Sequence, residues 1–259
     1  MSLLKKNKLR YLFFSVEITA ILFILALTIP SPSQASATIL DIIEQKRFAI
    51  VAIQGLTLQT SPGGTAAAIT PDGRILVNQQ QHVQYAVNAG AGIIIDPSGI
   101  IVTNTHVIYG SNQIIVTLKD GTRYPAAVAY ISPSYDFSLL RIRPAQALDA
   151  IDMADSSAIS LGDDIVTVGN SPLLKETISG GKVIGEGLRP VNGGQSLEVI
   201  ELNINHYSGD SGGPVLDKDG QLVGLLSAKI ESANRACLAI PVNKIKSAYL
   251  TLVSPPQNR

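Results

Sequence analysis

Short runs of apolar and β-branched residues alternate with turn residues along most of the chain beyond about residue 90. Runs such as GIIID and IIVTN are separated by the tight turn Pro97-Ser98-Gly99, and Asp120-Gly121 separates the next two runs. Short apolar runs bounded by Gly, Pro and Asp are typical of strands and hairpins. The pattern therefore predicts an all-β domain, built as a sandwich or a barrel.

The strand pattern is interrupted at residues 144–157, which have the character of a linker. Because the strands fall into two groups around this linker, we predict two small barrels. The first would span about residues 48–143 and the second about residues 158–242. Residues 56–90 are rich in Gly, Thr, Ala, Gln and Asn, and they predict a long loop or an added hairpin in the first barrel.

Two segments show helical rather than strand spacing of their apolar residues. ILDIIEQKRF, at residues 39–48, predicts a short helix before the first strand. VNKIKSAYLTLV, at residues 242–253, places its apolar residues on one face and predicts a closing helix. Six residues follow that helix, so we expect no further domain after it.

The first 37 residues have the three parts of a secretory signal. A basic cluster comes first: Lys5, Lys6, Lys8 and Arg10. An apolar stretch at residues 11–30 and the A-x-A site Ala35-Ser36-Ala37 follow. The apolar stretch is long enough to span a bilayer, so residues 1–37 fit both a cleaved signal peptide and a membrane anchor. We expect residues 38–259 to form an exported domain.

Composition narrows the classes of function. The chain has 20 basic and 20 acidic residues, so its net charge does not favour binding to nucleic acid. Its single cysteine, Cys237, excludes an internal disulfide and lies in an apolar run typical of a buried strand. The three histidines, His82, His106 and His206, lack the paired spacing of a metal site, so neither a metal nor a cofactor is expected.

Ser211 lies in the motif Gly209-Asp210-Ser211-Gly212-Gly213-Pro214-Val215. A serine hydroxyl is a weak nucleophile at neutral pH, so peptide hydrolysis needs a base to take its proton and donors to bind the oxyanion. Gly209 can adopt backbone angles closed to other residues, which would turn its N–H inward together with that of Ser211. An ordinary glycine-rich turn is the alternative interpretation, and the length of the motif argues against it.

His106 and Asp136 are candidates for the base and its supporting carboxylate. His106 comes at the end of the apolar strand in IVTNTHV, and Asp136 directly precedes the apolar run FSLL. Histidine is the usual base because its unperturbed pKa is about 6.5, and a carboxylate holds the imidazole in the required tautomer. Alone, His106 would more often be a structural residue, and Asp136 would often be only a turn residue. With Ser211 they follow the His, Asp, Ser order of chymotrypsin-type proteases.

Five segments, in this order, resemble the protease domain of the HtrA/Deg family of trypsin-like serine proteases: GAGIIIDPSGIIVTNTHVI, YDFSLLRI, LGDDIVTVGNSP, GDSGGPV and ACLAIPVNKI. The match covers about residues 40–253. It implies two six-stranded antiparallel β-barrels of the chymotrypsin type, with a C-terminal helix and a site in the crevice between the barrels. It also implies the catalytic triad His106, Asp136 and Ser211, and an oxyanion hole at Gly209 and Ser211 with Asp210 between them.

The resemblance further implies protein or peptide substrates and an acyl-enzyme intermediate. It points to the bacterial periplasm, or the extracytoplasmic face of the inner membrane, and to a trimer as the oligomeric form. The sequence departs from the family in lacking the usual C-terminal PDZ domains, so we expect control to lie in loops such as residues 56–90.

Asp210 is a second departure, because the HtrA family usually has Asn at this position. The trypsin branch carries Asp there and pairs it with a new N-terminal amine, but no obvious activation site precedes a matching start here. A Lys or Arg partner and a turn cap both remain open for Asp210.

Four residues are candidates for substrate binding. In the trypsin-like fold, the residue six before the serine lines the base of the primary pocket, which here is Asn205. Because Asn205 is not acidic, we expect no strong preference for cleavage after Lys or Arg. His206 is placed to line the site, and Ser227 and Ala228 match the strand that pairs with the substrate backbone.

The sequence thus predicts an exported serine endopeptidase. The alternative is a catalytically silent trypsin-like fold that acts as an extracytoplasmic binding or scaffold module, with the oxyanion loop in a collapsed state.

Overall fold

The computed structural model describes residues 39–59, 68–69, 75–76, 84–169, 177–190, 196–207, 209–229 and 236–254. The predicted signal or anchor at residues 1–37 and His82 lie outside these ranges. Among the residues described, no helix has the length and apolar character needed to cross a bilayer.

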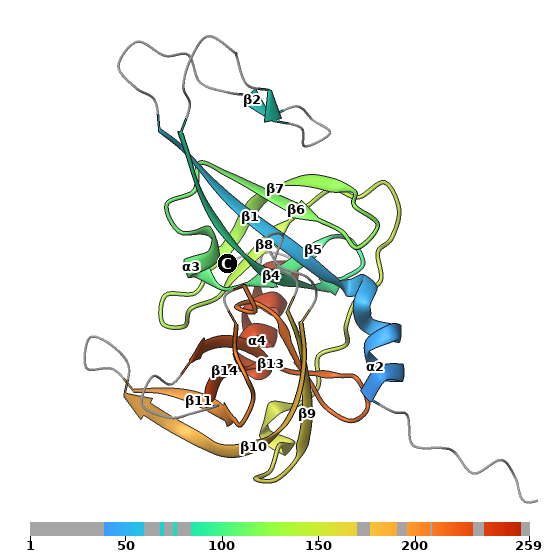
Figure 1. Cartoon of the computed structure of the whole chain (residues 1–259), viewed down its shortest axis with the longest axis vertical. Helices are drawn as coiled ribbons and strands as arrows, with labels where there is room; N and C mark the ends of the chain where they lie inside the picture. Colours follow the sequence, from blue (N-terminus) through green and yellow to red (C-terminus); the bar gives the residue numbers. More distant parts are fainter. Residues whose placement is uncertain are drawn as a thin grey trace, which may run out of the picture. The chain divides into compact units, whose positions relative to one another are not determined.

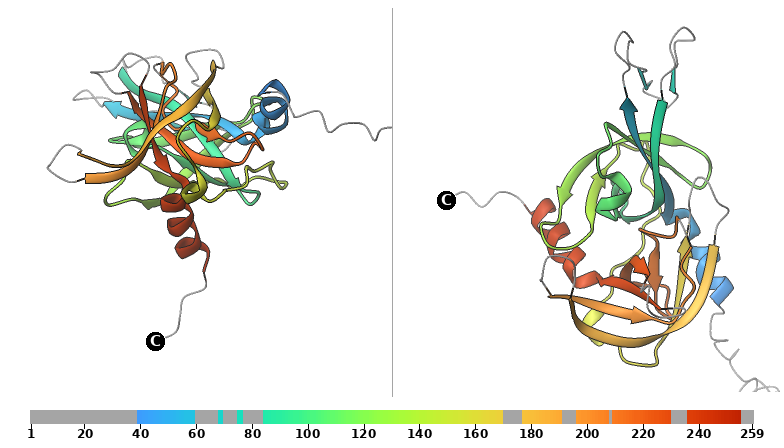
Figure 2. Two further views of the ribbon diagram at one scale, coloured as in Figure 1. Left: turned by 90° about the horizontal axis from the view of Figure 1, so that it is seen from below. Right: turned by 60° about the vertical axis from the view of Figure 1, so that its left-hand side comes forward.

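Six antiparallel strands close the first barrel in the order β1-β4-β5-β8-β7-β6 (Figure 1). They are β1 (Ile50–Gln59), β4 (Gln84–Asp96), β5 (Ile100–Thr103), β6 (Gln113–Thr117), β7 (Arg123–Ile131) and β8 (Ser138–Arg141). β1 pairs with β4 from Ile50 to Gln59, whereas its pairing with β6 ends at Leu56. The two strands therefore continue beyond the barrel as an arm, seen in the right-hand view of Figure 2. Part of the segment predicted as a loop or added hairpin is thus a hairpin, and a small sheet of β2 (Ala68–Ile69) and β3 (Ile75–Leu76) lies within it.

The second barrel also has six strands, in the order β10-β11-β14-β13-β12-β9. They are β9 (Asp164–Gly169), β10 (Thr177–Pro190), β11 (Ser196–Leu202), β12 (Pro214–Leu216), β13 (Leu222–Lys229) and β14 (Cys237–Pro241). The predicted fold class, two six-stranded antiparallel barrels with a C-terminal helix, is confirmed.

The helical segments are short apart from the last one. They are α2 (Ile39–Lys46), the 3-10 turn η1 (Arg47–Ala49), α3 (Thr105–Ile108), the 3-10 turn η2 (Ser156–Ala158) and α4 (Val242–Val253). α2 and α4 confirm the two predicted helices. α3 was not predicted: the strand expected to end at His106 stops at Thr103, and His106 lies in the helical turn that follows.

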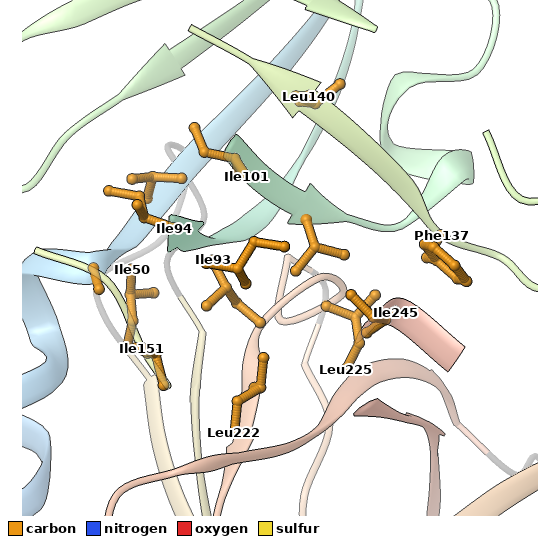
Figure 3. Packing of buried hydrophobic residues seen from close by; sticks show 14 of the residues in the cluster. Ile50, Ile93, Ile94, Ile101, Phe137, Leu140, Ile151, Leu222, Leu225 and Ile245 are labelled. Atoms are coloured by element: carbon orange, nitrogen blue, oxygen red, sulfur yellow. The ribbon is translucent and has the colours of Figure 1, made fainter. Parts of the chain in front are cut away.

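One apolar cluster joins the two barrels. It contains Ile93 and Leu140 from the first barrel, Leu222 and Leu225 from the second, and Ile245 from α4 (Figure 3). A smaller cluster, which includes Cys237, fills the interior of the second barrel. Burial of apolar area contributes about 25 cal/mol per Å², so the shared cluster favours one fixed arrangement of the two barrels.

Hydrogen bonds fasten α4 to the linker and to the first barrel. The Asn243 amide donates to Asp155 over 2.7 Å, and this bond, followed by those from Ser157, lowers the pKa of Asp155 to about 2. Tyr249 donates its hydroxyl to Asp96, at the end of β4. α4 therefore connects the linker before the second barrel with the first barrel.

Candidate active site

His106 and Asp136 form a hydrogen-bonded pair on the first barrel. β5 and β8 pair side by side, with Thr103 opposite Ser138, so the residues that follow β5 and precede β8 meet. Asp136 Oδ2 lies 2.6 Å from His106 Nδ1, and Asp136 Oδ1 accepts the backbone N–H of His106 over 3.0 Å. A carboxylate can only accept, so Nδ1 carries the proton and Nε2 is left as the basic nitrogen.

Backbone and side-chain contacts fix this pair from behind. The buried Asn104 donates its amide to the carbonyl oxygen of Asp136 over 2.8 Å. The hydroxyls of Thr105 and Ser138 form a hydrogen bond over 2.9 Å. These bonds tie the turn that carries His106 to the loop that carries Asp136, so contacts within the first barrel hold the imidazole in its orientation.

Ser211 lies on a glycine-rich turn that docks against β4 of the first barrel. Ala91 donates its N–H to the carbonyl oxygen of Ser211 over 2.8 Å. A Cβ atom at Gly212 would lie 2.2 Å from the carbonyl oxygen of Ala91, so only glycine allows this approach. Gly212 also has a φ of 84°, in the left-handed region that favours glycine. The serine of the second barrel is thereby held directly on the first.

Ser227, on β13, contacts both halves of the site. Its hydroxyl donates to Asp136 Oδ2 over 3.2 Å, and its carbonyl oxygen lies 3.5 Å from Ser211 Oγ. Ser227 was predicted only as part of the strand that pairs with substrate, and its contact with Asp136 was missed. Nothing in the local sequence indicates a contact between residues 91 positions apart.

The backbone around Ser211 leaves two N–H groups available. Gly209 has a φ of 100°, and Asp210 donates its own N–H back to the carbonyl oxygen of Tyr207 over 3.1 Å. Within the described ranges, the N–H groups of Gly209 and Ser211 have no protein acceptor. Two unpaired donors on either side of Asp210 are the arrangement that an oxyanion requires.

Asp210 is buried beneath this turn, only 5% exposed. Its Oδ2 accepts the N–H of Tyr207 over 2.8 Å, and its Oδ1 accepts the hydroxyl of Thr177. No Lys or Arg of the described chain forms an ion pair with it. Of the two roles that the sequence left open for Asp210, the structure shows the turn cap, through the N–H of Tyr207. The second hydrogen bond, from Thr177, was not indicated by the sequence.

The remaining candidates for substrate binding lie in different surroundings. Asn205 is exposed and lines a cavity of about 470 Å³ together with the start of β10, at Thr177–Gly180, and with Tyr207. His206 is half-buried, and Ala228 pairs with Leu238 of β14. Among the described residues that line this cavity, none is charged and none is Ser211. The position of Asn205 at the base of the primary pocket stays a prediction.

Among the described residues, the Ser211 hydroxyl donates to the carbonyl oxygen of Ser227 and makes no hydrogen bond to His106. Two closed barrels that share one core, with a His-Asp pair and a serine turn linked through Ser227, define a protein of the chymotrypsin-type fold. Residues 90–225, more than half of the chain, match the family model described as a trypsin-like peptidase domain. The protein belongs to this family.

Several curated relatives are serine proteases. The chain is 32% identical over 169 residues to the putative serine protease HhoA of Synechocystis, covering 64% of this chain and 43% of HhoA. It is 35% identical over 168 residues to the periplasmic serine endoprotease DegP of Escherichia coli, covering 63% of this chain and 35% of DegP. The chain thus spans less than half the length of these relatives.

Solved structures share the fold. A structure described as the HtrA-type protease AlgW with a decapeptide superposes with a TM-score of 0.68 at 22% identity, covering 84% of this chain and 68% of AlgW. The resemblance to HtrA and DegP proteins that the sequence motifs indicated is confirmed.

Proposed function

We propose that the protein is a serine endopeptidase with His106, Asp136 and Ser211 as its catalytic triad. The observation that carries the proposal is the position of Ser227, which touches Asp136 through its hydroxyl and Ser211 through its carbonyl oxygen. Asp136 in turn holds His106 at 2.6 Å. Three groups from distant parts of the sequence therefore converge around one residue of β13.

In this mechanism His106 Nε2 takes the proton of Ser211 as Oγ attacks the carbonyl carbon of the scissile peptide. Asp136 keeps the proton on Nδ1 and stabilises the imidazolium that forms. The oxyanion of the tetrahedral intermediate binds the N–H groups of Gly209 and Ser211. His106 then gives its proton to the leaving amine, and a water molecule hydrolyses the acyl-enzyme by the same steps in reverse order.

Replacement of Ser211 by Ala tests this proposal. Cleavage of an unfolded protein substrate should fall by a factor on the order of 10⁶, and a fluorophosphonate probe should label the wild-type protein but not Ser211→Ala. Ser160→Ala, a change at an exposed serine, serves as the matched control. Equal cleavage by the wild-type protein and Ser211→Ala would show that another residue, or a contaminant, is responsible.

The silent scaffold is the competing function. It requires an oxyanion turn that is collapsed, with its donors consumed by the protein. The available N–H groups of Gly209 and Ser211 favour the enzyme instead.

We propose further that residues 1–37 direct export, so that the protein acts on exported or misfolded proteins at the periplasm or the outer face of the inner membrane. The basic and apolar pattern of that segment and the periplasmic names of relatives such as DegP support this location. Fractionation of cells that express the full chain tests it. A trimer remains a proposal by resemblance, to be tested by light scattering of the purified protein.

Asn205 stays the predicted base of the primary pocket, and the described residues that line the cavity beside it carry no charge. We therefore propose that the protein has no strong preference for cleavage after Lys or Arg. A cleavage-site profile with purified residues 38–259 would reveal it, and cleavage mainly after Lys or Arg would contradict it.

A further inference from the structure

A buried carboxyl group lies directly beneath the proposed oxyanion hole. Asp210 separates Gly209 from Ser211 in the sequence, so its side chain and the two N–H donors belong to one rigid turn. A carboxyl group taken out of water needs hydrogen bonds or an opposite charge to compensate for lost hydration. Since the described residues supply no cation to Asp210, its position depends on its hydrogen bonds.

The two hydrogen-bond donors to Asp210 come from different parts of the chain. The N–H of Tyr207 comes from three residues earlier in the same loop, so this bond shapes the turn without attaching it to a strand. The hydroxyl of Thr177 comes from 33 residues earlier, at the first position of β10. Thr177 is itself paired in the sheet with Gly169, the last residue of β9. The backbone of Gly212 and Gly213 also bonds to Leu226 of β13, so the threonine is the contact that fastens the Asp210 side chain itself to the framework of the second barrel.

Gly169 makes room for this contact. A Cβ atom at Gly169 would lie 2.0 Å from Asp210 Oδ1 and 2.3 Å from Thr177 Oγ1, closer than any real contact. The end of β9, the start of β10 and the serine turn thus form a fitted cradle for the pair of side chains.

We propose that Thr177 is a positioning residue for the oxyanion hole. Its hydroxyl anchors Asp210 to β10 and thereby holds the N–H groups of Gly209 and Ser211 in place, and this role rests on the proposed function. Thr177 touches no reacting atom and acts through Asp210. The anchor is a buried contact from an uncharged donor, so salt should screen it little compared with an exposed ion pair.

A series of substitutions at position 177 varies the strength of the hydrogen-bond donor to Asp210. Thr177→Val keeps the shape and removes the hydroxyl, and it should lower kcat roughly 10- to 100-fold, somewhat less than the loss of a whole oxyanion donor. KM should change less than kcat, because the proposed loss is in binding of the oxyanion, although Thr177 also lines the cavity beside Asn205. Thr177→Ser should recover most of kcat, and Thr177→Cys, with a weak donor, should fall between Ser and Val.

Thr167→Val is the matched control in the same barrel. Thr167 is buried on β9, 3% exposed, and its hydroxyl donates to the carbonyl oxygen of Ser179 over 3.4 Å, away from Asp210. This variant should keep the wild-type kcat, which separates loss of the Asp210 anchor from a general effect of removing a buried hydroxyl.

Hydrogen–deuterium exchange across residues 204–214 supplies a readout that does not need activity. Exchange should be faster in Thr177→Val than in Thr177→Ser, Thr167→Val or the wild-type protein. If Thr177→Val matches Thr167→Val in both kcat and exchange, the positioning role is wrong. If the wild-type protein neither cleaves substrate nor reacts with the fluorophosphonate, the proposed function fails, and faster exchange in Thr177→Val would still support the anchor. Should Thr177→Val not fold, Thr177→Cys and Thr177→Ser decide the question by the same two measurements.

Discussion

The first barrel and the second barrel each contribute one carboxylate to the site, and the two are held in different ways. Asp136 accepts three hydrogen bonds, two of them from His106 and one from Ser227, and its side chain is 37% exposed. Asp210 is almost fully buried and accepts two, from Thr177 and Tyr207. In the proposed mechanism Asp136 acts on an imidazole that changes its charge during the reaction, whereas Asp210 supports a backbone turn that keeps its position. Partial exposure suits the first task and burial suits the second.

The largest effect should come from the exposed carboxylate. Asp136→Asn should lower kcat by roughly 10⁴-fold, because an amide can donate to Nδ1 and so favour the wrong tautomer of His106. The fold should survive, since the backbone contacts of Asp136 with Asn104 and Thr105 do not use its carboxylate. Steady-state cleavage rates, with circular dichroism as a check on folding, measure both. A loss below tenfold would mean that Asp136 does not orient the base.

An intermediate effect is expected from filling the cradle of the buried carboxylate. Gly169→Ala should displace Asp210 or Thr177, lowering the free energy of unfolding by about 1–3 kcal/mol and kcat by roughly 10- to 100-fold. Gly224→Ala is the control, because an added Cβ there meets its nearest atom, the carbonyl oxygen of Ile240, at 3.2 Å and is remote from Asp210 in the hydrogen-bond network. Urea denaturation and kcat measure the two quantities. A wild-type kcat in Gly169→Ala would show that the packing of Gly169 against Asp210 and Thr177 does not affect catalysis.

The smallest effect concerns a third carboxylate, Asp96, which also accepts a hydroxyl but lies away from the site. Tyr249→Phe should lower the free energy of unfolding by about 1–2 kcal/mol at pH 7 and leave kcat unchanged. It shows what a bond between a hydroxyl and a carboxylate contributes when no catalytic group depends on it. Tyr109→Phe, at a residue that is 77% exposed, is the control.

The effect of Tyr249→Phe should depend on pH. Hydrogen bonds from Ser98 and then Tyr249 lower the pKa of Asp96 below its ordinary 3.8. A lowered carboxyl pKa stabilises the folded state fully above the unfolded value and loses this contribution as the pH falls through the folded value. The difference between wild-type and Tyr249→Phe should therefore shrink below pH 3.8, and an unchanged difference at lower pH would contradict the assignment.

The same contrast explains what the sequence could predict. Strand positions follow from apolar runs and turn residues. His106 and Asp136 were proposed from the order of the motifs and from the family resemblance, and the pairing of Thr103 with Ser138, which the sequence did not specify, brings the two residues together. The anchor of Asp210 does not follow, because Thr177 is distant in sequence and is an ordinary strand residue in isolation. The arm of β1 and β4 was ambiguous because backbone pairing, rather than an apolar pattern, builds strands at polar positions such as Gln59 and Gln84.

Asn205 shows what sequence spacing leaves open. Its distance from Ser211 along the chain predicts a place at the base of the primary pocket, and in the structure it is exposed beside the start of β10. A count of residues fixes how far a loop can reach and leaves open the direction in which each side chain points.

The bond between Ala91 N–H and the carbonyl oxygen of Ser211 has a mechanical consequence. Ser211, the proposed nucleophile, belongs to the second barrel but is hydrogen-bonded to the first barrel, which also carries the proposed base His106. A small relative motion of the two barrels should therefore move Ser211 together with His106. A larger relative motion would first have to break the hydrogen bond from Ala91.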